Sequence, residues 1–170
     1  DVCRGDEAWN SSQVWYMPFD DLNAEVTSDI TWWPWREWYY TINVCNFAIS
    51  RCGEDNSQLS NKMKRIKGQV LFLRGLSYYN LVGYYQNPPL ITDYATYSSL
   101  DGLYTTNSTY DNVLDQVEKD FHEAMELLPS RDEGGEWAGG RATCGAAAGY
   151  YARALMMRQK YSDALTVLKD

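Results

Sequence analysis

The chain has 170 residues, of which 45% are hydrophobic and 15% aromatic, and its formal net charge is −8. This length suits one domain with a sizeable core and leaves little room for two complete domains. The negative charge argues against a nucleic-acid partner, because phosphate binding needs a basic patch. No segment has the roughly 18 consecutive apolar residues that a membrane-spanning helix requires.

Residues 31–40 read TWWPWREWYY, with four tryptophans and two tyrosines in ten positions. From Trp38 onward the apolar residues follow a 4-3-4-3 spacing that marks one face of a helix. They are Trp38, Ile42, Cys45, Ile49 and Cys52. The pattern predicts a first helix that ends at Gly53, with Trp38 in the core. Before it, residues 1–35 are predicted to form an irregular N-terminal segment with a tryptophan-rich loop.

A second helix is predicted to start near Asn61 and to end before the two prolines of QNPPL, which cannot continue a helix. Its tail, VLFLRGLSYYNLVGYY, is apolar on more than one face, so we expect it to lie between neighbours. Gly75 and Ser77 would let another helix approach closely. Arg74 is a cation within this apolar stretch, where an unpaired charge would be costly. It either pairs with a carboxylate that locks two helices together, which we favour, or binds an anionic ligand.

Residues 92–107 lack helical periodicity and are predicted to form a long loop. The clearest helix of the sequence follows at residues 110–128, where the apolar positions obey the i, i+3, i+4, i+7 rule. Ser108 and Asp111 supply a capping-box start for this helix, and Pro129 supplies its end.

Thr143 is predicted to cap a fourth helix, at about residues 144–158, that is thin because it is rich in glycine and alanine. A fifth helix starts near Tyr161, and the chain is expected to be truncated within it. No strand-like alternation of useful length occurs. The prediction is therefore an all-α fold of stacked helical hairpins of the tetratricopeptide type, with long irregular loops. The first helix should pair with the second, the third with the fourth, and the fifth with a helix that this chain lacks.

The sequence gives no support for catalysis, a metal site or a cofactor. Its single histidine, His122, lies near no evident nucleophile, and no phosphate-binding, nucleophile-elbow or zinc-protease motif is present. Four cysteines without a CxxC pair argue against a zinc site. Cys45 and Cys52 are expected to be buried small hydrophobes.

Three further tryptophans, Trp32, Trp33 and Trp35, precede the predicted helix around a proline, where they cannot easily all be buried. Two interpretations are about even on chemistry alone. Exposed indoles could stack on the C–H faces of sugar rings, while nearby polar side chains bond the hydroxyls. Alternatively, the three rings form a packing wedge.

Four blocks of the sequence, in order and spacing, resemble the SusD/RagB family of nutrient-binding outer-membrane lipoproteins. The most specific is GQVLFLRGLSYYNLVGYYQNPPLI at residues 68–91. It is preceded by WREWYYTINVCNFAI, which contains Asn46, and followed by YDNVLDQVEKDFHEAMELLP and GRATCGAAAGYYARALM. Gln69 stands where glutamate is usual in the family. The resemblance covers roughly residues 36–170, a tetratricopeptide-like helical region.

The resemblance implies a non-enzymatic lipoprotein on the extracellular face of the Bacteroidetes outer membrane. Such a protein binds oligo- or polysaccharides and delivers them to a SusC-like TonB-dependent transporter, and its N-terminal lipid anchor is absent from this chain. Family members bind sugars mainly through aromatic residues in loops. On this hypothesis Trp32, Trp33 and Trp35 form a stacking platform, and Asp29 and Arg36 bond the sugar hydroxyls.

Two other functions remain open. The helical hairpins could form an interaction module that docks onto a transporter or another partner, with the tryptophans facing protein in an apolar patch with a polar rim. A cytoplasmic tetratricopeptide scaffold is the other alternative, and the long insertion at residues 86–108 speaks against it.

Overall fold

The computed structural model describes residues 29–53, 55–97, 99, 101–133 and 140–169. Within these ranges the regular structure is helical and no strand occurs, which confirms the all-α prediction. The chain divides into two units, Asp1–Tyr40 and Thr41–Asp170, and helix α2 (Asp29–Cys52) crosses the boundary. Residues 1–28 of the predicted irregular segment lie outside the described residues.

Helix α2 starts earlier than predicted and includes Pro34 in its second turn. The expectation of an irregular loop is therefore wrong for Trp32, Trp33 and Trp35, which are helical. A proline inside a helix removes one backbone hydrogen bond and crowds the preceding turn. One side-chain contact at i, i+4 spans this turn, because Arg36 lies over the Trp32 ring. Trp35 contacts Tyr39 in the following turn.

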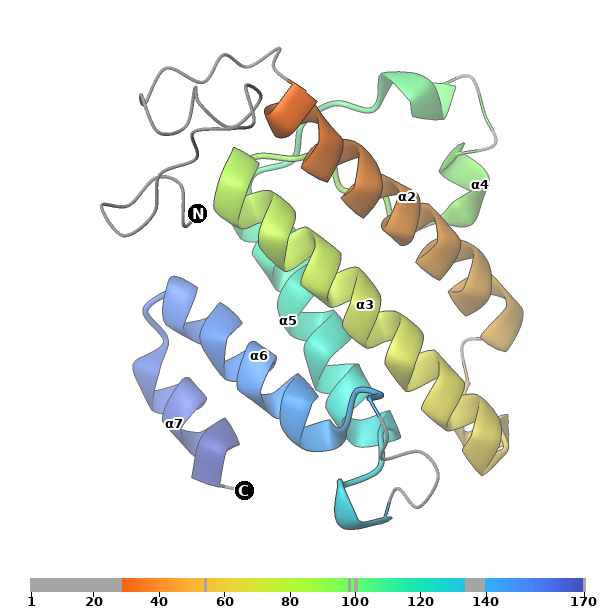
Figure 1. Ribbon diagram of the computed structural model, residues 1–170, viewed down its shortest axis with the longest axis vertical. Helices are drawn as coiled ribbons and strands as arrows, with labels where there is room; N and C mark the ends of the chain where they lie inside the picture. Colours follow the sequence, from red (N-terminus) through yellow and green to blue (C-terminus); the bar gives the residue numbers. More distant parts are fainter. Residues whose placement is uncertain (1–28, 54, 98, 100, 134–139, 170) are drawn as a thin grey trace, which may run out of the picture. The chain divides into compact units, whose positions relative to one another are not determined.

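The second unit is built from antiparallel helices. They are α3 (Asn61–Tyr85), α5 (Tyr110–Leu127), α6 (Cys144–Met157) and α7 (Tyr161–Lys169), together with the end of α2. Helix α5 packs against both α3 and α6 and runs antiparallel to each (Figure 1). The predicted start at Asn61 and the Thr143 cap are confirmed, since the Thr143 hydroxyl accepts a hydrogen bond from the Ala146 N–H.

Close approach of α5 to α3 depends on a glycine, as the sequence predicted. A Cβ atom at Gly75 would lie 3.1 Å from the ring of Phe121, which is fully buried. Below this contact, Leu71 of α3, Ala124 of α5 and Ala147 of α6 form one apolar cluster. Small residues on each helix thus bring the three helices together.

The prediction for the packing of the last helix is wrong in one respect. The sequence left the fifth helix without a partner in this chain, whereas α7 packs against α6. Ala152 and Leu155 of α6 and Ala164 of α7 form a separate buried cluster. Helix α6 accepts two neighbours because its small residues lie on two faces, and sequence periodicity alone did not resolve the second face.

The predicted loop at residues 92–107 contains two short helices, α4 (Tyr94–Tyr97) and η3 (Asp101–Tyr104). The capping prediction for α5 is also corrected, because Thr109 caps the helix and accepts a hydrogen bond from the Asn112 N–H. Ser108 instead accepts a hydrogen bond from the Leu90 N–H, 3.1 Å away. The two ends of this long connection are thereby tied together.

The favoured interpretation of Arg74 is confirmed. Its Nε and Nη2 atoms donate to the two carboxylate oxygens of Asp120 on α5, at 2.8 and 2.7 Å. Nη1 donates to Asn46 Oδ1 on α2 at 2.9 Å. Only 6% of Arg74 and 1% of Asp120 are exposed, so this is a buried, bidentate ion pair that joins three helices.

The same network holds the segment that follows α3. The backbone carbonyl of Ile91 accepts hydrogen bonds from the Tyr78 hydroxyl and from Asn46 Nδ2, each at 2.8 Å. The Ile91 N–H donates to the Tyr78 hydroxyl, also at 2.8 Å.

Cys45 is buried, as expected, and its thiol is not in a disulfide. Burial raises the pKa of this thiol to about 11.

We expect Asp120→Asn to lower the free energy of unfolding by about 3–5 kcal/mol, because it leaves the Arg74 charge buried without a counter-charge. Urea unfolding followed by circular dichroism measures the change. Glu126→Gln on the same helix is the control: its carboxylate is exposed, and a change within about 0.5 kcal/mol is expected. Equal stability of the two variants would contradict the assigned role of the ion pair.

Two glycines of α3 should respond oppositely to a side chain. Gly75→Val should lower the free energy of unfolding by about 1–3 kcal/mol, since the new side chain enters the contact with Phe121. Gly83→Ala should raise it by about 0.5–1 kcal/mol, because a Cβ there meets nothing within 4 Å and alanine favours the helix. The same unfolding experiment measures both, and stabilisation by Gly75→Val would rule out a close helix contact.

Candidate functional site

Helix α2 gathers the predicted ligand-binding residues on one side. We call four residues in the first turns of α2 the indole surface: Trp32, Trp33, Trp35 and Arg36. At 3.6 residues per turn these positions fall within an arc of roughly 160° around the helix axis. Asp29, the first residue of α2, falls in the same arc, although its side chain lies outside the described part of the structure. One helix therefore presents all five positions in a fixed spacing.

The three tryptophans of the indole surface differ in exposure. Trp32 is 49% and Trp33 is 58% exposed, so both rings are open to solvent. Trp35 is half-buried, and its ring centroid lies 4.9 Å from that of Tyr39. The packing interpretation fits Trp35, whereas Trp32 and Trp33 remain available for a ligand.

Arg36 is held by two neighbours. Its guanidinium carbon lies 4.9 Å from the centre of the Trp32 ring, a cation–π contact. Its Nε and Nη2 atoms donate to Glu37 Oε1 at 2.9 and 2.5 Å. These bonds use two of roughly five guanidinium N–H donors, so the others can reach a ligand. Arg36 is more than half exposed and lies beside the open indoles.

The sequence interpretation missed two aromatic neighbours of this surface. Tyr40 is 68% exposed and follows Arg36 by one helical turn, and Tyr39 covers part of Trp35. The signal was present, because both tyrosines stand at i+4 from a member of the indole surface. The sequence interpretation did not use this spacing, because it predicted a start of the first helix several residues after the start of α2.

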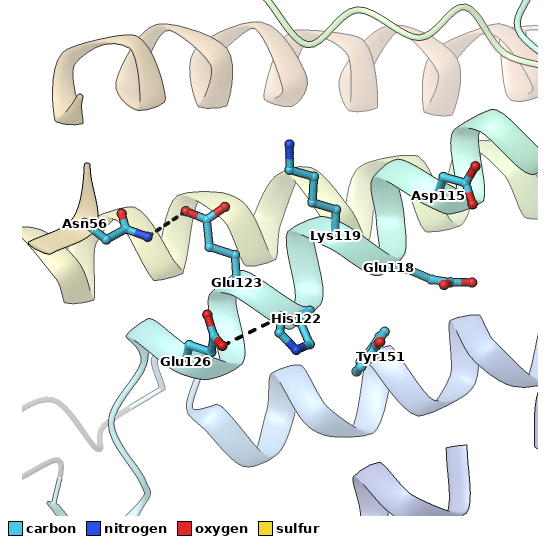
Figure 2. A pocket seen from close by; sticks show the side chains of 8 residues that line it. All are labelled: Asn56, Asp115, Glu118, Lys119, His122, Glu123, Glu126 and Tyr151. Carbon is cyan, nitrogen blue, oxygen red and sulfur yellow. Dashed lines mark hydrogen bonds and ion pairs between the residues drawn. The ribbon is translucent and has the colours of Figure 1, made fainter. Parts of the chain in front are cut away.

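A second candidate is a groove of about 590 Å³ in the second unit. Figure 2 shows its lining side chains, which come from η2 (Asn56–Gln58), α5 and α6. They are Asn56, Asp115, Glu118, Lys119, His122, Glu123, Glu126 and Tyr151.

The inner carboxylates of this groove are bonded to the protein itself. Glu118 accepts hydrogen bonds from Lys160 at 2.9 Å and from Arg158 at 3.1 Å. Glu123 accepts one from Asn56 at 3.0 Å and lies 3.3 Å from Lys67 Nζ. Partial burial raises the pKa of Glu123, but the Asn56 hydrogen bond and the Lys67 charge outweigh it, so the net shift is downward. Both carboxylates therefore bridge different elements of the chain, and a raised pKa suited to a general acid is not found at Glu123.

His122 also lines the groove, and its side chain is exposed. Its ring packs edge-on against Tyr151 at a centroid distance of 5.6 Å, and Nδ1 lies 4.0 Å from a Glu126 oxygen. In the described ranges, no group of three or more His, Cys, Asp or Glu residues is placed to hold a metal ion. None of the helices there combines the length and the apolar character needed to cross a membrane.

Comparison with known families identifies the class of this helical protein. Residues 3–156 match the model of a SusD-like family, described as starch-binding and associating with the outer membrane. The chain belongs to this SusD-like family, and the resemblance noted in the sequence is confirmed. Members of the family are cell-surface binding proteins. A search of curated proteins found no match.

Solved structures agree with the fold. A SusD superfamily protein from Parabacteroides distasonis is 25% identical, with a TM-score of 0.77 over 93% of this chain and 35% of its own. A SusD-like carbohydrate-binding protein from Bacteroides fragilis is 23% identical, with a TM-score of 0.76 over 89% and 30%. A laminarin-binding SusD-like protein is 23% identical, with a TM-score of 0.78 over 94% and 33%. The chain thus spans about a third of the length of these structures.

Proposed function

We propose that this chain binds oligo- or polysaccharides at the bacterial cell surface through the indole surface and catalyses no reaction. The observation that carries the proposal is the pair of open indoles, Trp32 and Trp33, presented on one helix of a SusD-like chain. An indole offers a flat apolar face and a polar N–H, which suits a sugar ring with its own apolar and hydroxyl faces.

Each residue of the indole surface has a part in this proposal. Trp32 and Trp33 stack on successive sugar rings, and Trp35 adds the open part of its ring. Arg36 donates hydrogen bonds to hydroxyls with the N–H groups that Glu37 does not occupy. Asp29 accepts hydrogen bonds from hydroxyls at the start of the helix. Because the residues share one helix, their spacing is fixed before the ligand arrives.

We propose that an N-terminal lipid anchor attaches the whole protein to the outer membrane. The protein then passes its glycan to a SusC-like TonB-dependent transporter. The family's description as associating with the outer membrane supports this proposal. Residues 36–170 would act as a tetratricopeptide-like scaffold.

A second candidate function, docking of the helices onto a protein partner without sugar contact, has one observation in its favour. Helix α7 exposes an apolar stripe at i, i+4, i+7: Tyr161, Leu165 and Leu168 are each more than half exposed. Such a stripe is typical of a surface that contacts another helix.

Isothermal titration calorimetry with uncharged hexasaccharides, including maltohexaose and laminarihexaose, tests the glycan proposal. At least one should bind the wild-type chain. The double variant Trp32→Ala and Trp33→Ala should weaken that binding at least about tenfold, because truncating central indoles removes the largest contacts.

Tyr104→Ala is the matched control, since Tyr104 is an aromatic residue of η3 that is 84% exposed and lies outside the indole surface. Its affinity should equal that of the wild type, and circular dichroism should show the same helicity in all variants. If the double tryptophan variant binds the oligosaccharide with unchanged affinity, the stacking proposal is contradicted. Binding of a transporter or other protein without any sugar binding would favour the docking function.

A further inference from the structure

We infer that Glu37 is a specificity-determining residue that makes the indole surface select uncharged glycans over glycans that carry carboxylates or sulfates. The inference rests on the proposed function, and it assigns a role to a residue outside the predicted set. Three features of the first turns of α2 carry it: the Arg36–Glu37 contact, the local charge, and the donors that remain on Arg36.

The contact places a carboxylate next to the single cation of the surface. Both Arg36 donors that face Glu37 end on the same oxygen, Oε1, at 2.9 and 2.5 Å. The Trp32 ring fixes the guanidinium from another side. Arg36 is therefore positioned by the protein's own groups in the absence of ligand, and it has a counter-charge already.

The local charge is unfavourable to an anionic sugar. Residues 29–40 contain two acidic residues, Asp29 and Glu37, and one basic residue, Arg36. A uronate that approaches Arg36 must either displace Glu37 or sit beside it, and like charges at that distance repel. The partial positive charge of a helix N-terminus favours anions only within the first turn, and Arg36 lies beyond that turn of α2.

An uncharged sugar meets neither obstacle. It can stack on Trp33 and on the open part of Trp32 while Arg36 keeps its bonds to Glu37. The remaining guanidinium N–H groups donate to hydroxyls. Arg36 thus contacts the uncharged sugar as a hydrogen-bond donor while it keeps its ion pair with Glu37.

The test compares maltohexaose or laminarihexaose, whichever binds the wild type, with hexagalacturonate by calorimetry at low salt. The wild type should bind the uncharged sugar more tightly. Glu37→Gln should raise the affinity for hexagalacturonate about two- to fivefold, the factor for a partly exposed charge pair of about 0.5–1 kcal/mol. The affinity for the uncharged sugar should change less, so the ratio of the two affinities should shift toward hexagalacturonate, and added salt should reduce this shift.

Glu126→Gln changes the net charge equally but lies on α5, outside the indole surface, so it should alter neither affinity. If the wild type prefers hexagalacturonate, or if Glu37→Gln leaves the ratio of affinities unchanged, the inference is overturned while the proposed function stands. If the wild type binds none of these sugars, the proposed function and the inference fail together.

Discussion

The buried ion pair between Arg74 and Asp120 is the interaction on which the second unit depends. Two charges removed from water are costly, and the cost is offset only where geometry is good and the other polar atoms are satisfied. Both conditions hold: the pair is bidentate, Asn46 takes another Arg74 donor, and Gln116 donates to Asp120 at 2.7 Å. Arg74 thereby joins α2, α3 and α5 through directional hydrogen bonds.

Helix α2 contributes both to this network and to the candidate site. Asn46, which bonds both Arg74 and the Ile91 carbonyl, lies in the second half of α2, and the first half of that helix carries the indole surface. A binding residue on a helix is held more accurately than one on a free loop. The indoles are therefore displayed by a regular element, although the sequence had suggested an irregular one.

Sequence periodicity predicted much of this architecture, because each long helix has a clear apolar stripe or cap. The helix at residues 110–128, the close approach at Gly75 and the carboxylate partner of Arg74 were all predicted from local patterns and confirmed. The start of α2 was not predicted, since proline is typical of the first turn of a helix, whereas Pro34 lies in the second turn of α2. The pairing of Glu37 with Arg36 beside Trp32 likewise depends on helical geometry at that point.

The central claim is that sugars bind on the open indoles of α2, and the indole N–H signals in a two-dimensional NMR titration test it most directly. Tryptophan variants assign the signals, and an uncharged oligosaccharide is then added stepwise. The account predicts that the Trp32 and Trp33 signals shift most, that Trp35 shifts less, and that all three follow one binding curve. Saturable binding that leaves the Trp32 and Trp33 signals in place would contradict it.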